Sequence, residues 1–118
     1  MAKIGVVVFA DTESHADLAK VVRALLLVRE ANEAGDDVRL IFDGAAVGWI
    51  GALADPAHRS HALFQTVGGR ITGACAYCAA AFGATEAVEA AAVPLLDEYR
   101  QHPSLRSLVA EGFEVLVF

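Results

Sequence analysis

The sequence holds two cysteines, and they lie three positions apart in the segment Gly73-Ala-Cys75-Ala-Tyr-Cys78. A short strand is predicted just before them and an alanine-rich helix from Ala76, so the first thiol falls at a strand-to-helix junction. Free N–H groups at a helix start stabilise negative charge and can lower a cysteine pKa from ~8.5 to about 3.5–7.5. We therefore predict that Cys75 is an activated nucleophile and that Cys78 is the resolving thiol.

Other interpretations of the pair stay open. Two buried structural cysteines beside small residues on a packed helix would give the same pattern. A zinc site needs four ligands, so His15 or an aspartate would have to join the two thiols. No metal and no cofactor are therefore expected. A thioredoxin fold is not expected either, because here the cysteine pair follows the third predicted strand instead of lying near the start of the chain.

The runs Ile4–Phe9 and Val38–Phe42 are apolar without alternation, which is typical of strands buried on both faces. Between them, Ser14 resembles a helix cap, apolar residues follow at helical spacing, and Gly35 ends the pattern. A strand, a helix and a strand in this order predict a right-handed crossover within a parallel sheet.

The alternation continues to the end of the chain and predicts one domain over residues 1–118. The class is α/β, with three layers and a five-stranded, mainly parallel sheet in a doubly wound, flavodoxin-like arrangement. The further predicted elements are a helix over His58–Thr66, a strand over Ile71–Ala74, a helix over Ala76–Phe82 and Thr85–Ala91 broken at Gly83, a strand over Val93–Leu96, a helix over Ser104–Glu111 and a strand over Phe113–Phe118.

Parallel strands share one carboxyl edge, where ligands bind in such sheets. Asp11, Asp43 and Cys75 each follow a predicted strand, so we expect them at this edge. The other candidate binding residues there are His15, Gly44, Trp49 and Tyr77. The aspartates also suit turns, and Trp49 also suits the core. Three further histidines, His58, His61 and His102, are interpreted as surface or capping residues.

Composition excludes several classes of protein. Apolar residues make up 56% of the 118, which excludes disorder. The net charge of −6 opposes binding to nucleic acid or to anionic lipid. Uncharged stretches fall short of the ~20 residues of a membrane span, and no cleavable leader is expected. A cytoplasmic location is expected.

Leu27 falls on the charged face of the first predicted helix, which suggests contact with another subunit.

The chain resembles the DsrE/DsrF-like sulfur-relay family. The resemblance is carried by the buried first strand, the strand end Ile41-Phe-Asp-Gly44, the cysteine segment 73–83, and the ending Leu108-Val-Ala-Glu-Gly-Phe-Glu-Val-Leu-Val-Phe118. It implies a small α/β domain that assembles into homotrimers or homohexamers. It also implies a persulfide on Cys75, exchanged with donor and acceptor proteins. This sequence differs from the relay members of that family in having a second cysteine, Cys78, three residues after Cys75.

Three hypotheses for function remain. The chain is a persulfide carrier or small sulfurtransferase that uses Cys75, or a noncatalytic module that binds a small ligand at the strand edge. In the third, it is an oligomer that senses redox state through a Cys75–Cys78 disulfide.

Overall fold

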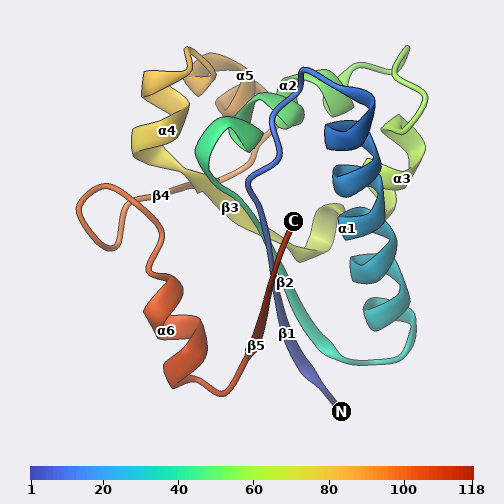
Figure 1. Cartoon of the computed structure of the whole chain (residues 1–118), viewed down its shortest axis with the longest axis vertical. Coiled ribbons are helices and arrows are strands. Elements are labelled where there is room, and N and C mark those ends of the chain that lie inside the picture. The colour runs from blue at the N-terminus through green and yellow to red at the C-terminus, as the bar shows by residue number, and fades with distance from the viewer.

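A five-stranded sheet runs through the middle of the molecule, with helices on both faces (Figure 1). The computed structural model describes residues 1–118. The strand order is β4-β3-β2-β1-β5, and every pair is parallel. The strands are β1 (Lys3–Val8), β2 (Asp37–Phe42), β3 (Ile71–Cys75), β4 (Leu95–Leu96) and β5 (Glu114–Val117). The predicted three-layer α/β class is confirmed, and the sheet is parallel throughout.

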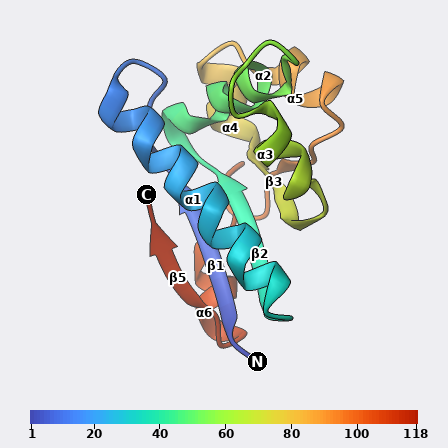
Figure 2. The ribbon, with the colours of Figure 1, turned by 90° about the vertical axis from the view of Figure 1, so that its right-hand side faces the viewer.

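The helices occupy the crossovers and the carboxyl edge of the sheet. The long helix α1 (His15–Glu33) joins β1 to β2 and lies along them (Figure 2). The others are short: η1 (Gly44–Val47), α2 (Gly48–Ala54), α3 (His61–Thr66), η2 (Gly68–Arg70), α4 (Ala76–Ala81), α5 (Thr85–Ala90) and α6 (Leu105–Ala110). No helix in the chain has both the length and the apolar character that a bilayer crossing requires.

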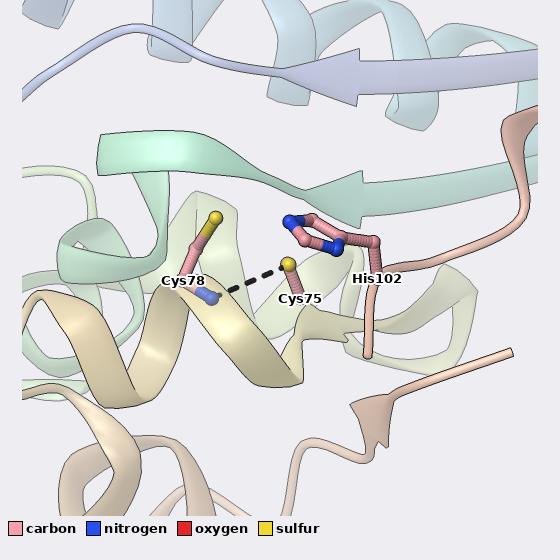
Figure 3. A group of neighbouring side chains, drawn as sticks. All are labelled: Cys75, Cys78 and His102. Carbon is pink, nitrogen blue, oxygen red and sulfur yellow. Dashed lines mark hydrogen bonds between the residues drawn. The ribbon is translucent and has the colours of Figure 1, made fainter. Parts of the chain in front are cut away.

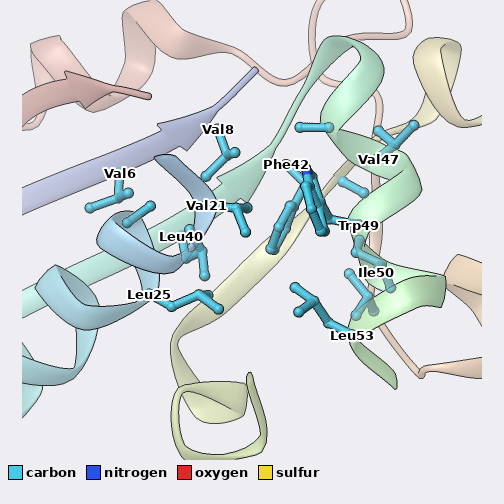
Figure 4. Packing of buried hydrophobic residues seen from close by; sticks show 14 of the residues in the cluster. Val6, Val8, Val21, Leu25, Leu40, Phe42, Val47, Trp49, Ile50 and Leu53 are labelled. Carbon is cyan, nitrogen blue, oxygen red and sulfur yellow. The ribbon is translucent and has the colours of Figure 1, made fainter. Parts of the chain in front are cut away.

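The larger core lies between the sheet and the helices α1 to α5 (Figure 4). Leu40 and Phe42 of β2 point into it, together with Leu25 of α1 and Ile50 of α2, and all four are fully buried. Full burial of such side chains stabilises the fold by about 1.5–3 kcal/mol each. This core fixes β2, the strand that leads directly to Asp43.

A smaller core covers the opposite face beneath α6. Val7 and Ile41 of the sheet pack there against Leu108 and Phe113. The pairing of β1 with β2 has no register shift, from Lys3 beside Asp37 to Val8 beside Phe42. Consequently Val7 and Ile41 are neighbours on this face.

Some predictions from sequence need correction. Gly44–Ala54, where no element is predicted, forms η1 and α2. The third helix begins at His61 rather than His58, and β4 has two residues. Leu27 packs against the larger core of its own chain, so it gives no evidence of a partner. Leu27 is covered although it lies toward the charged face, because α3 packs against α1 and widens the face that is covered.

Gly73 of β3 allows β4 to approach closely. A Cβ built at this position would lie 2.6 Å from the carbonyl oxygen of Pro94 and 2.6 Å from Leu96 Cγ. We expect Gly73→Ala to lower the free energy of unfolding by about 1–3 kcal/mol, because the Pro94 carbonyl oxygen is held by a hydrogen bond from the N–H of Ala74. Urea denaturation measures this. Gly69→Ala is the control, since nothing lies within 4 Å of its Cβ position. Equal stability of the two variants would contradict the close packing of β3 and β4.

Candidate functional site

Cys75 is the last residue of β3 and the N-cap of α4, so the predicted strand-to-helix junction is confirmed. Its Sγ accepts a hydrogen bond from the backbone N–H of Cys78 at 3.4 Å. A capping side chain satisfies one of the N–H groups that a helix start leaves without a partner. The cysteine spacing therefore serves the local fold as well as any chemistry.

The prediction that Cys75 is an ionised, accessible thiol is wrong for this structure. Its side chain is completely buried, and burial raises the pKa of the Cys75 thiol from 9.0 to about 12. The N–H of Cys78 opposes this shift, whereas the thiol of Cys78 and the charge of Asp43 add to it. Loss of solvation outweighs a single N–H donor because α4 has six residues and little dipole.

Cys78 is the more accessible of the two thiols, since its side chain is half-buried. Its Sγ donates to Oδ1 of Asp43 at 3.8 Å. The same Oδ1 accepts from the N–H of Gly44 at 2.8 Å and caps η1. Asp43 is itself buried. It caps the turn after β2 and also contacts Cys78, so the two interpretations of Asp43 from the sequence are compatible.

His102 completes the cluster. One ring nitrogen of His102 and the sulfurs of Cys75 and Cys78 lie within 4.8 Å of one another (Figure 3). Nδ1 lies 2.7 Å from the carbonyl oxygen of Arg100, and the ring stacks on Tyr77 with centroids 4.9 Å apart. Since a carbonyl oxygen only accepts, Nδ1 carries the proton of the neutral ring and Nε2 has a free lone pair.

The interpretation of His102 as a surface or capping residue is therefore wrong. Its position in the sequence carried a usable signal: it follows the fourth predicted strand, Val93–Leu96, at the same carboxyl edge as Cys75. Five residues separate that strand from His102, so their closeness in space is not evident from the sequence. A tight turn brings the imidazole back to the sheet.

That turn spans Tyr99 to His102 and is closed by two backbone hydrogen bonds, of 2.9 and 2.8 Å. Its central residues, Arg100 and Gln101, have φ of +48° and +68°, the left-handed region that usually takes glycine or asparagine. The carbonyl oxygen of Gln101 accepts from the N–H of Tyr77 at 2.9 Å and faces Cys75 Sγ at 3.9 Å. These contacts and the stacked ring hold a strained turn over the buried thiol.

Three residues predicted at the site lie elsewhere. Trp49 is buried, and its indole N–H donates to the carbonyl oxygens of Ala10 and Asp11, so it anchors the loop after β1. Asp11 is exposed and bonds its neighbour Thr12. His15 is exposed and lines a separate surface pocket with Trp49. Gly44, by contrast, adjoins the cluster and adopts a φ of +54°.

Comparison with known proteins gives a match in structure alone. No family model matches the sequence. No curated protein matches it either. The fold is similar to that of a conserved protein of unknown function from Bacteroides thetaiotaomicron, with a TM-score of 0.66 and 13% identity over 97% of this chain and 94% of that chain. At this identity the likeness shows the α/β fold only.

The cluster can do three kinds of chemistry. A half-buried thiol beside a carboxylate and an imidazole can be deprotonated and can attack a sulfur electrophile. Two thiols this close can form a disulfide. Two sulfurs and an imidazole nitrogen are also ligands that soft and borderline metal ions prefer.

The raised pKa of Cys75 predicts how stability depends on pH. Between about pH 9 and 12 the folded chain keeps the Cys75 proton, whereas the unfolded chain loses it at its ordinary value of 9.0. Folded protein then binds more protons, so the free energy of unfolding falls as pH rises through this window. In Cys75→Ala we expect a shallower fall, measured by urea denaturation at several pH values. Identical slopes in the variant and the original chain would contradict the assignment.

Proposed function

We propose that this protein is a thiol-based sulfur carrier of the DsrE-like kind, which holds a persulfide on Cys78 and uses Cys75 as the second thiol. The observation that carries the proposal is the half-buried Cys78 thiol, placed 3.8 Å from the Asp43 carboxylate and beside the His102 ring and a second sulfur. The roles of the two cysteines are thus exchanged relative to the expectation from sequence, because Cys75 has no exposed surface.

The loading step uses His102 as the base. The Cys78 S–H turns from Asp43 to Nε2 of His102, which takes its proton, and the resulting thiolate attacks the outer sulfur of a donor persulfide, R–S–SH. The sulfur–sulfur bond of the donor breaks, a bond forms from Cys78 Sγ to the outer sulfur, and R–S⁻ leaves and takes up the proton from His102. The products are Cys78–S–SH and R–SH, so no external oxidant is needed.

The sulfur can leave by either of two routes. An acceptor thiolate can attack the outer sulfur and regenerate the Cys78 thiol. Alternatively, Cys75 attacks Sγ of Cys78, which forms the Cys75–Cys78 disulfide and releases H₂S. The high pKa of Cys75 slows the second route, because a protonated thiol is a poor nucleophile. Burial of Cys75 would therefore preserve the persulfide for transfer to an acceptor.

A redox-sensing role is the second candidate, favoured by the approach of the two sulfurs to within 4.8 Å. A thiol oxidant would take two electrons and two protons from the pair and leave the disulfide. Donor and acceptor proteins, assembly into homotrimers or homohexamers, and a cytoplasmic location remain predictions that accompany the carrier proposal.

Persulfide loading tests the proposal through the mass of the intact protein. After exposure to glutathione persulfide, the chain should gain about one sulfur atom, and peptide mapping should place it on Cys78. Cys78→Ala should lose the adduct because the accessible nucleophile is gone. Cys75→Ala should keep the adduct and accumulate more of it, because the discharging thiol is absent.

His15→Gln is the matched control, since this histidine is exposed and outside the cluster. An adduct that persists in Cys78→Ala, or one carried by Cys75 in the original chain, would overturn the assigned roles.

A further inference from the structure

We infer that Cys75, Cys78 and His102 form a binding site for a divalent transition-metal ion of the zinc type. The two sulfurs and one imidazole nitrogen come from β3, α4 and the turn after β4, and they lie within 4.8 Å of one another (Figure 3). In a tetrahedral zinc site, bonds of ≈ 2.0–2.3 Å place the ligand atoms roughly 3.5–3.8 Å apart. Contraction of the cluster by about 1 Å, within reach of small side-chain rotations, would reach that geometry.

The imidazole is already oriented as a metal ligand requires. Histidines that bind metals commonly donate the other ring N–H to a carbonyl or carboxylate, which fixes the tautomer and the ring orientation. Nδ1 of His102 has this partner in the carbonyl oxygen of Arg100 at 2.7 Å, which leaves Nε2 free. Stacking on Tyr77 further restricts the ring.

The surroundings of the sulfurs also favour a cation. The N–H of Cys78 points at Cys75 Sγ and would stay bonded to a metal-bound thiolate. The buried carboxylate of Asp43 lies 3.8 Å from Cys78 Sγ and adds negative charge beside the cluster. A dication would offset the cost of two ionised thiols in this poorly solvated place, since coordination deprotonates a thiol. No lysine or arginine side chain forms a hydrogen bond or ion pair with the three candidate ligands.

Three protein ligands leave a fourth coordination position, as catalytic zinc sites do. The expectation of no metal rests on the need for His15 or an aspartate to join the two cysteines. His15 lies in a separate pocket, whereas His102 lies at the cysteines. The ion can enter past Cys78 and His102, since both are only partly buried.

This inference goes beyond sulfur transfer and does not rest on it. Metal and persulfide would compete for the same Cys78 sulfur, so bound zinc would block loading. Zinc binding is measured with no sulfur donor present, and persulfide loading is measured with a chelator present. Each proposal can therefore fail while the other stands.

The test is titration of the reduced, metal-free protein with Zn²⁺ against a chromophoric chelator, with Co²⁺ as the spectroscopic probe. We expect one Zn²⁺ per chain, release of protons on binding, and a thiolate-to-cobalt charge-transfer band. His102→Gln should weaken zinc affinity by at least about tenfold, the size of effect that even outer-shell partners have. Cys78→Ser should lose much of the charge-transfer intensity, and His15→Gln should bind as the original chain does.

Circular dichroism of each variant confirms that it is folded before titration, and His102→Gln alters a half-buried side chain that belongs to neither hydrophobic core. Absence of stoichiometric binding by the reduced protein would overturn the inference. Equal affinity in the original chain, His102→Gln and Cys78→Ser would also overturn it, because the ion would then be bound elsewhere.

Discussion

The parallel pairing of β2 with β3 is the constraint on which the site depends. Phe42 lies beside Ala74 in this pair, so the next residue of each strand, Asp43 and Cys75, emerges at the same edge of the sheet. Thirty-one residues of chain separate them in the sequence, and only the ladder makes them neighbours. The register shifts between Leu40 and Ile41, and beyond this shift the side chain of Phe42 is fixed in the larger core. Packing far from the thiols thus determines which carboxylate they meet.

The same edge contains one conformation that the chain would not adopt in isolation. Two consecutive left-handed residues, Arg100 and Gln101, turn the chain so that His102 returns to the cysteines. Residues in this region cost of order 1–3 kcal/mol each, and they persist where surrounding contacts determine them. The N–H of Tyr77 supplies such a contact through the Gln101 carbonyl oxygen. The turn and α4 therefore hold each other in place, and the buried sulfur of Cys75 lies beneath both.

Local patterns in the sequence predict the five strands, most of the helices, and three residues of the site, Cys75, Cys78 and Asp43. Unbroken apolar runs identified β1 and β2, the Ser14 cap and Gly35 bounded α1, and the strand-to-helix transition located Cys75. Asp43 followed from the rule that parallel strands share a carboxyl edge. His102 did not follow, because no pattern predicts a left-handed turn at Arg100-Gln101. The acidity of Cys75 was also mispredicted, since the burial of a single sulfur depends on tertiary contacts such as that with Gln101.

One thiol of the pair, that of Cys78, is half-buried, and the other, that of Cys75, is completely buried beneath a turn. Competitive labelling of the native, reduced protein with N-ethylmaleimide, followed by peptide mass spectrometry, tests this claim most directly. We expect Cys78 to be modified well before Cys75, and we expect the difference to disappear in denaturant. Modification of Cys75 first, or of both at equal rates in the native protein, would contradict it.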